Sequence, residues 1–513
     1  MSSPSAPSPL LSSLQRLEGS EKDALLDPLG SASFQAVSWR ARQLAGELVG
    51  AGLSGCRVGL SSLPDRNWLE AFWAILLSGG TVVPISPLHP APERSQFLRQ
   101  SGARAQLVSA SLASSFAEGP VPRLVFDQGH LLHAAPVELQ RPLTGQERAE
   151  PTALLLFTSG TTGQPKGVPL SHTQVWACVQ TLSAAWELTA DDRLLHALPL
   201  HHVHGICVAL LNAFCSGACT VLLPRYEPAH VLESLAHCSV LMSVPTQHKR
   251  LVDHLESLPR AEQAEASARL QALRLITSGS AKLPEKLGRR LEQLSGQYPL
   301  ERYGMTEVGI VIGNPLFGSR RPGSCGRPLP GSEIRIVDEQ GRDVAPGEAG
   351  EIWIRGASVF SGYDADAEAT RAAFTDGFFR SGDTARWAQD GFIDILGRTS
   401  VDIIKSGGYK LSAVEIEEQL RAHDWVQDVA VVGLPDEDWG ERVVAVITPA
   451  PSALAIIERD ADAAAQELRD WLRQRMAGYQ VPKAVEWWPE LPRNAMGKVQ
   501  KPELIRLLLS ARS

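Results

Sequence analysis

Hydrophobic and polar positions along the first half of the chain form alternating blocks, one with helical periodicity and the next a short apolar run. From Phe34 onward this pattern predicts helices near residues 34–52, 65–79 and 92–101, and strands at Val58–Ser61, Thr81–Ile85 and Gln106–Val108. Such alternation is typical of a parallel sheet covered by helices, and it recurs from Leu154 to Tyr303. Between residues 120 and 150 the periodicity fades, which we interpret as a connection inside the large domain.

The pattern changes after Arg320, where proline and glycine separate short strands such as Glu333–Val337 and Glu351–Arg355, typical of a β-rich subdomain. A second boundary is expected at Gly397-Arg398. Beyond it the predicted elements are a capping box at Ser412–Glu415 that opens a helix, strands Val429–Val432 and Val443–Ile447, a helix from about Ala463 to Met476, and a last helix begun by Pro502.

The predicted fold class is therefore α/β, with a large N-terminal domain of helix-covered sheets that includes the β-rich subdomain, and a small α+β C-terminal domain. We expect a disordered tail over residues 1–20, the N-terminal domain over 21–397 and the C-terminal domain over 398–513.

Composition excludes several classes of function. Of the 513 residues, 44% are apolar and 21% charged, which is typical of soluble globular proteins. A net charge of −8 argues against a nucleic-acid binder. The most apolar stretch, Ala71–Pro87, is interrupted by Ser78-Gly79-Gly80, so no membrane span is expected. Seven scattered cysteines and an N-terminus without a signal-peptide pattern favour a reducing, cytoplasmic location.

One segment carries distinctive chemistry. The apolar run Leu155–Phe157 leads directly into a loop rich in hydroxyl groups and glycine that ends at Lys166. Glycine lets backbone N–H groups converge on anionic oxygens, and the hydroxyls and the lysine add donors and a charge. The loop is not the common P-loop, because Pro165 stands five residues after Gly160 and Gly167 follows the lysine. A flexible linker is the alternative, but the strand before the loop and the lysine after it favour a nucleotide site.

This loop resembles the phosphate-binding loop of the adenylate-forming superfamily, which includes acyl-CoA synthetases, adenylation domains of peptide synthetases and firefly-type luciferases. Other segments match motifs of that superfamily in the same order: Leu198–Gly205 (a histidine gate), Tyr303–Glu307 (adenylate and magnesium), Ser381–Asp383 (ribose), Gly397-Arg398 (hinge) and Pro492–Lys498 (catalytic lysine). The resemblance covers the chain from about residue 30 to its end.

The resemblance implies an enzyme that uses ATP, Mg²⁺ and, as cosubstrate, CoA. Its catalytic residues would be Lys498, Thr306, Glu307 and Lys166, with Glu307 as the metal-binding residue. The ATP-binding residues would be Thr158, Ser159, Gly160, Thr161, Thr162, Gly163, Tyr303, Asp383 and Arg398. Each has an ordinary structural alternative: Asp383 as a turn residue, Arg398 as a bridge between domains, Lys498 as a surface charge.

The resemblance to this superfamily also implies that the C-terminal domain is mobile. It would turn near Arg398 to Asp402, withdraw Lys498, and bring the CoA-binding residues Ser406, Gly407, Gly408 and Tyr409 to the pocket. Asp402 lies four residues after Arg398, one later than in many relatives, so the hinge residue itself stays open.

The substrate-binding residues implied by the resemblance are His202, His204, Arg250, Ser278, Ser280 and Arg302. Relatives that act on fatty or aromatic acids usually have a small or apolar residue at the position of Arg302, so a cation there indicates an acid with a second negative charge. Arg250 matches a second arginine of the malonyl-CoA synthetases, and residues 397–410 resemble that branch most. We therefore expect malonate to be ligated to CoA through malonyl-AMP, with AMP and pyrophosphate as products.

Several alternatives remain open. Methylmalonate differs from malonate by one methyl group, worth only about 1–3 kcal/mol of discrimination, and oxalate or succinate would also suit a cationic pocket. A fatty or aryl acyl-CoA synthetase, an amino-acid adenylation unit, and a light-emitting enzyme share the same loops. A non-catalytic module would be expected to have lost Lys166, Glu307, Asp383 or Lys498, and all of these are present.

Overall fold

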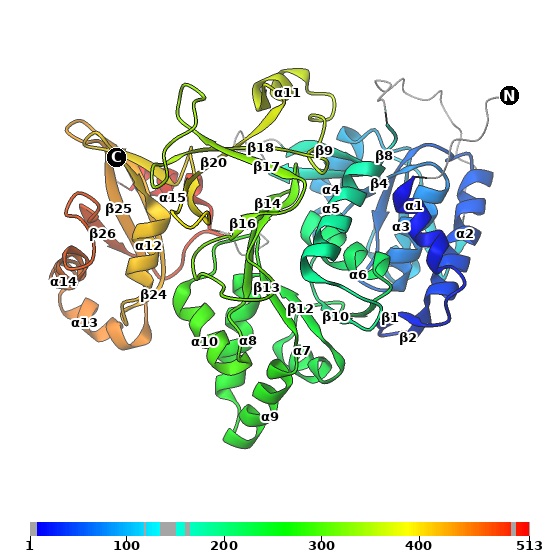
Figure 1. Cartoon of the computed structure of the whole chain (residues 1–513), viewed down its shortest axis with the longest axis horizontal. Helices are drawn as coiled ribbons and strands as arrows, with labels where there is room; N and C mark the ends of the chain where they lie inside the picture. Colours follow the sequence, from blue (N-terminus) through cyan, green and yellow to red (C-terminus); the bar gives the residue numbers. More distant parts are fainter. Residues whose placement is uncertain (1–7, 117–118, 134–149, 160–164, 494–498, 512–513) are drawn as a thin grey trace.

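The computed structural model describes residues 8–116, 119–133, 150–159, 165–493 and 499–511 (Figure 1). Its N-terminal sheet has the strand order β7-β6-β5-β3-β4-β8-β9, and the inner strands run parallel. The strands are β3 (Arg57–Ser61), β4 (Thr81–Pro84), β5 (Ala105–Ser109), β6 (Arg123–Asp127), β7 (His130–His133), β8 (Thr152–Ser159) and β9 (Pro165–Ser171). At one edge β8 and β9 form an antiparallel pair around residues 160–164, where the phosphate-binding loop is expected.

The second sheet has the order β16-β15-β14-β13-β12-β10-β11-β1-β2. Its strands are β1 (Asp23–Asp27), β2 (Gly30–Ser33), β10 (Arg193–His196), β11 (Cys219–Leu222), β12 (Val240–Ser243), β13 (Leu275–Ser278), β14 (Leu300–Met305), β15 (Gly309–Gly313) and β16 (Arg327–Pro328). Neighbouring strands from β1 to β14 along this order are parallel, so Ser278 and Arg302 lie toward the carboxyl ends of adjacent strands. Ligands of α/β proteins usually bind at such ends.

A continuous apolar core joins these two sheets. Helix α3 is buried almost all round, as expected for a helix packed on every side. The helices before the β-rich part are α1 (Pro9–Leu17), α2 (Phe34–Gly50), α3 (Arg66–Leu77), α4 (Ala91–Gln100), α5 (His172–Trp186), α6 (Asn212–Cys215), α7 (Pro228–Ser234), α8 (Pro245–Ser257), α9 (Arg260–Gln271) and α10 (Glu285–Ser295). A π-helix spans His204–Leu211, and short 3₁₀ turns span Ala110–Ser115 and Leu235–His237.

A third, antiparallel sheet forms the predicted β-rich subdomain. It consists of β17 (Ser332–Val337), β18 (Gly350–Gly356), β19 (Phe374–Thr375), β20 (Phe378–Trp387) and β21 (Ile393–Arg398), with α11 (Ala367–Ala373) beside it. In Figure 1 this sheet and α11 lie above the second sheet. The pairing of β20 with β21 sets Asp383 opposite Arg398.

The C-terminal unit, at the left of Figure 1, has a sheet and cores of its own. Its elements are β22 (Ile403–Ser406), β23 (Tyr409–Ser412), α12 (Ala413–Arg421), β24 (Val426–Asp436), β25 (Gly440–Pro449), a 3₁₀ turn (Pro451–Ala453), α13 (Leu454–Arg459), α14 (Ala461–Arg473), β26 (Ala484–Trp487) and α15 (Lys501–Ser510). Residues of β24 alternate between the core under α12 and α14 and the core under α15, because successive side chains point to opposite faces. Both faces are covered, which explains the continuous apolar run that predicted this strand.

The predicted fold class is confirmed, with two corrections. Residues 9–17 are not a disordered tail: α1 begins after Ser8, whose hydroxyl accepts from Leu11, and Leu10 and Leu14 are fully buried. The expected connection at residues 120–150 contains the hairpin β6–β7. Its turn, Gln128-Gly129, has positive φ at both residues, the geometry of a tight hairpin turn.

No helix in the part of the chain that the structure describes is long and apolar enough to cross a membrane.

Candidate active site

The phosphate-binding loop begins and ends on paired strands, with Thr158 of β8 opposite Lys166 of β9. Gly160, Thr161, Thr162 and Gly163 lie outside the described residues, and Ser159 ends β8. The Lys166 ammonium lies over the Tyr363 ring, 4.9 Å from its centroid. The chain after the loop is held by Asp364, whose N–H donates to the Gly167 carbonyl at 2.8 Å and whose carboxylate pairs with Arg57 at 2.7 Å.

Tyr363 also reaches the second expected catalytic group. Its hydroxyl donates to the Glu307 carboxylate at 3.3 Å, so one aromatic side chain contacts both Lys166 and Glu307. Sequence reasoning missed Tyr363. In the sequence, Gly362 directly before Tyr363 indicates a turn, and the structure gives it a φ of 138°.

Glu307 lies in the turn after β14, next to the partly exposed Thr306. It is only 5% exposed, and burial raises its pKa, while nearby Arg398 and the Tyr363 hydrogen bond act in the opposite direction. A buried carboxylate with a single side-chain donor suits a hard cation such as Mg²⁺. Within the described residues no group of three or more His, Cys, Asp or Glu side chains is arranged to hold a metal.

Three predicted ATP-binding residues meet at the junction of the second and third sheets. The Tyr303 hydroxyl donates to one Asp383 oxygen at 2.6 Å, and Arg398 Nε lies 3.1 Å from the other. Arg398 also donates to the Ser381 carbonyl at 2.8 Å. These contacts fix the orientation of the Asp383 carboxylate. Each carboxylate oxygen can accept more than one hydrogen bond, so both have the capacity to accept hydrogen bonds from ribose hydroxyls.

In the histidine gate His204 is buried and His202 partly buried, and both are uncharged. His204 begins the π-helix, a geometry often found at functional sites, and its Nδ1 lies 3.1 Å from the Ser280 hydroxyl. Burial lowers the pKa of His202 to about 4, and burial together with Arg302 lowers the pKa of His204 well below its usual range. At neutral pH these rings therefore add no charge to the pocket.

Arg302 is the charged residue of this group. Its side chain is 5% exposed and lies against the turn Ser278-Gly279-Ser280, and its Nε and Nη2 have no hydrogen-bond partner among the residues that the structure describes. Within the same residues the buried Ser278 hydroxyl also has no partner. Burial lowers the pKa of Arg302 to about 10, so the guanidinium remains charged at neutral pH. An unpaired buried cation is costly, and an anionic ligand group would compensate it.

Arg250 lies on the exposed side of α8. The buried side of this helix is formed by His248, Leu251, Val252 and Leu255, and Arg250 is exposed, with its guanidinium over the Tyr226 ring at 5.3 Å. Two positions along a helix correspond to a turn of about 200°, so a residue two after the inward His248 points away from this buried side. Arg250 as the second arginine of the pocket stays a prediction.

The predicted CoA-binding residues form the tip of the β22–β23 hairpin. Gly407 and Gly408 have φ of 57° and 82°, and no described residue is a hydrogen-bond partner of the buried Ser406 hydroxyl. Tyr409 is 52% exposed and stacks on Tyr479 with ring centroids 4.2 Å apart. This hairpin belongs to the C-terminal unit, and the expected catalytic Lys498 lies outside the described residues.

The hinge segment is held by Asp402. One of its carboxylate oxygens accepts from the Arg398 N–H at 2.9 Å, and the other pairs with Lys501 at 2.5 Å. Lys501 also pairs with Glu417 at 2.7 Å, so α12 and α15 are both tied to Asp402.

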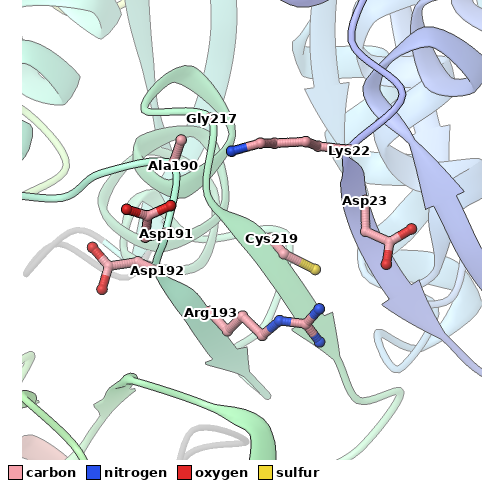
Figure 2. A pocket seen from close by; sticks show the side chains of 8 residues that line it. All are labelled: Lys22, Asp23, Ala190, Asp191, Asp192, Arg193, Gly217 and Cys219. Atoms are coloured by element: carbon pink, nitrogen blue, oxygen red, sulfur yellow. The ribbon is translucent and has the colours of Figure 1, made fainter.

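A separate pocket lies away from these groups, at the beginnings of β1, β10 and β11 (Figure 2). It is lined by Lys22, Asp23, Ala190, Asp191, Asp192, Arg193, Gly217 and Cys219. Asp192 has a structural role there, because Arg274 pairs with it at 2.6 Å and Ser239 donates to it at 2.7 Å. None of the predicted site residues lines this pocket.

Two helix-covered sheets, a β-rich sheet with the paired aspartate and arginine, and a separate α+β unit together define an enzyme class that binds adenine nucleotides. The chain belongs to the AMP-binding enzyme family: the family described as AMP-binding enzyme matches residues 15–364, and the AMP-binding enzyme C-terminal domain matches residues 415–498. The predicted resemblance to the adenylate-forming superfamily is confirmed.

Individual relatives cover nearly the whole chain. The human mitochondrial malonate–CoA ligase ACSF3 is 37% identical, with 95% of this chain and 90% of that protein covered. ATP-bound MatB from Rhodopseudomonas palustris has 31% identity and a TM-score of 0.85, with coverage of 98% and 99%. A malonyl-CoA ligase in a ternary product complex with methylmalonyl-CoA and AMP has 32% identity and a TM-score of 0.66, with coverage of 95% and 100%.

Proposed function

We propose that this protein ligates malonate to CoA with ATP, through malonyl-AMP, and releases malonyl-CoA, AMP and pyrophosphate. The observation that carries the substrate assignment is the buried guanidinium of Arg302 beside His204 and Ser280, whose Nε and Nη2 have no partner in the described part of the chain. Similarity to the human malonate–CoA ligase and to MatB also supports malonate as the substrate.

In the first half-reaction an oxygen of one malonate carboxylate attacks the α-phosphate of ATP. Lys166 and the loop hydroxyls would hold the leaving phosphates, Thr306 would contact the α-phosphate, and Lys498 would bridge the carboxylate and the α-phosphate. Glu307 would hold Mg²⁺, which supplies charge neutralisation at the phosphates. Tyr303, Asp383 and Arg398 would fix the adenosine end.

In the second half-reaction the thiol of CoA replaces AMP on the malonyl group. We propose that the N-terminal domain, which includes α1 and ends at residue 397, and the C-terminal domain 398–513 change position between these steps, which would bring Ser406–Tyr409 to the pocket. The TM-scores support this: at similar identity, the chain is more similar to ATP-bound MatB (0.85) than to the ternary product complex (0.66), as expected if the domains here are arranged for adenylation.

Arg302 would pair with the second carboxylate of malonate. A hydrogen bond to a charged group contributes about 1.5–3 kcal/mol net, which corresponds to roughly 10- to 150-fold preference over a monoacid. Methylmalonate is the second candidate, since a related malonyl-CoA ligase has been solved with methylmalonyl-CoA and a methyl group is weakly discriminated.

The test is product analysis by mass spectrometry after incubation with ATP, Mg²⁺, CoA and each of malonate, methylmalonate, oxalate, succinate, acetate and octanoate. We expect malonyl-CoA and AMP to dominate. Octanoyl-CoA as the main product would overturn the assignment of the acid, and the lack of any thioester would overturn the proposed reaction.

The Arg302→Ala variant should lose activity on malonate far more than on acetate. Arg355→Ala is the control, because Arg355 is an exposed arginine of β18 that pairs with Glu333 and is not among the predicted site residues, and we expect this variant to keep the preference for malonate. Equal losses on both acids in Arg302→Ala would contradict the role of Arg302.

For location we propose the cytoplasm. All seven cysteines are free in the structure, which suits a reducing compartment. Expression of a tagged full-length chain with fractionation of the cells would test this.

A further inference from the structure

Gly279 lies in the turn after β13, and the Arg302 side chain fills the space beside it. A Cβ atom added to Gly279 would lie 2.1 Å from Arg302 Cζ, 2.2 Å from Nη1 and 2.5 Å from Nε, distances that real Cβ atoms do not show. The guanidinium therefore occupies the volume that any other residue at position 279 would need.

The backbone does not explain this glycine. Gly279 is absent from the residues with positive φ, whereas its neighbour Ser280 adopts φ of 68° without being glycine. Steric approach of Arg302 is the visible reason for the missing side chain, because glycine is used where a group must come close to the backbone.

The close approach also positions the charge. Arg302 Nε and Nη2 have no partner within the described ranges. His204 lies near enough to Arg302 to be affected by its charge, and its ring contacts Ser280, which follows Gly279. A side chain at 279 would move the guanidinium by about 1 Å, since 2.1 Å would have to exceed 3.0 Å. Displacements of that size at a binding group can cost about 100-fold in rate.

We propose that Gly279 is a specificity-determining residue, which acts through Arg302 by leaving the space that sets how deeply the guanidinium lies in the acid-binding pocket. This inference rests on the proposed function, and it extends that function by assigning the preference for dicarboxylic acids to a pair of positions rather than to one arginine.

The test is a double-mutant cycle with Gly279→Ala, Arg302→Ala and the double variant, in which kcat/KM is measured for malonate and for propionate. Gly279→Ala should lower kcat/KM for malonate about 10- to 100-fold and change that for propionate little. The double variant should be no worse than Arg302→Ala alone, because the clash disappears when the guanidinium is removed.

Gly288→Ala is the matched control. Its Cβ would lie 2.3 Å from the Tyr298 hydroxyl, a comparable clash with a side chain outside the candidate site. It should lower the melting temperature and leave the ratio of malonate to propionate activity unchanged.

An unchanged ratio in Gly279→Ala, or additive losses in the double variant, would overturn the inference. If Gly279→Ala does not fold, the melting temperature of the double variant is the test. A melting temperature close to that of Arg302→Ala would show that the added methyl group and the guanidinium compete for one space. A double variant that also fails to fold would overturn the inference. Wild-type protein that makes no malonyl-CoA would instead refute the proposed function, so the two failures are distinguishable.

Discussion

The Asp383 carboxylate is held on both oxygens, by the Tyr303 hydroxyl at 2.6 Å and by Arg398 at 3.1 Å. Tyr303→Phe removes one of these contacts, and we expect the Kd for ATP, measured by calorimetry, to rise about 10-fold, since a hydrogen bond to a charged group contributes about 1.5–3 kcal/mol. Tyr298→Phe is the control, because the buried Tyr298 hydroxyl has no partner among the described residues. ATP binding equal to that of wild type in Tyr303→Phe would show that Arg398 alone orients the carboxylate.

His196 links protonation to stability. Its Nε2 contacts the Gly205 carbonyl at 2.9 Å, and burial lowers its pKa to about 4, whereas an unfolded histidine titrates near 6.5. As pH falls from about 6.5 to 4, the unfolded chain gains a proton that the folded chain does not, so this contribution to stability is present above 6.5 and is lost on acidification.

His196→Gln should therefore reduce the slope of unfolding free energy against pH by up to about 1.4 kcal/mol per pH unit in that interval, measured by urea denaturation. Glu70 and Glu301, whose pKa values burial raises to about 7, contribute a slope of opposite sign in both proteins, so it cancels in the comparison. Parallel pH profiles for variant and wild type would contradict the assignment.

Single residues show where sequence reasoning succeeds and where it does not. Arg302, Tyr303 and Asp383 were predicted because they stand at defined places in motifs, and the structure brings Tyr303 and Asp383 together across 80 positions of sequence. Arg250 also matches a motif, and its place on the exposed side of α8 leaves its role in the pocket a prediction. Tyr363 was missed because its contacts with Lys166 and Glu307 come from folding of distant segments.

Secondary structure elements were predicted well where periodicity is strong. Helices α2, α3 and α14 and strands β3, β4 and β25 lie within a few residues of their predicted bounds. Helix α1 was missed because only nine residues carry its pattern, and most of its stability comes from burying Leu10 and Leu14 against the rest of the chain. Strands β6 and β7 are as short as β3 and β4, but they lie between residues 120 and 150, where the alternation of helical and apolar blocks that marks β3 and β4 fades.

Substitution in the β22–β23 hairpin tests whether this element acts only in the second half-reaction, the transfer of the malonyl group to CoA. Gly408 has φ of 82° and open space around it, so alanine there introduces only backbone strain and a methyl group at the hairpin tip. If this tip admits CoA, Gly408→Ala should keep malonate-dependent pyrophosphate exchange within twofold and lower malonyl-CoA formation about 10-fold.

Gly391→Ala is the matched control, with φ of 79° and equally open surroundings in a different turn. It should leave both half-reactions unchanged. A Gly408→Ala variant that slows both half-reactions equally would contradict a role of this hairpin in the second step alone.

At the scale of the whole molecule, the C-terminal unit contacts the rest of the chain partly through exposed ion pairs. Lys410 pairs with Glu339 at 2.7 Å, Arg386 with Glu415 at 3.0 Å and Lys286 with Asp424 at 3.6 Å. Exposed pairs contribute about 0–1 kcal/mol each, so they hold this arrangement weakly. Such contacts leave no pattern in sequence, which is why the elements could be predicted but their relative placement could not.

The Glu339 and Lys410 pair offers a test of domain movement. Cysteines at these positions, in a chain whose Cys56, Cys215 and Cys325 are replaced by serine, could be joined by a short, cleavable bis-maleimide. If the arrangement described is the one for adenylation, the linked protein should retain malonate-dependent pyrophosphate exchange and lose at least about 10-fold in thioester formation, because the hairpin with Gly407 and Gly408 could no longer move. Cleavage of the linker should restore thioester formation, and each single-cysteine variant treated with the same reagent should keep both activities. Full thioester formation by the linked protein would mean that the reaction is completed without separation of Glu339 from Lys410.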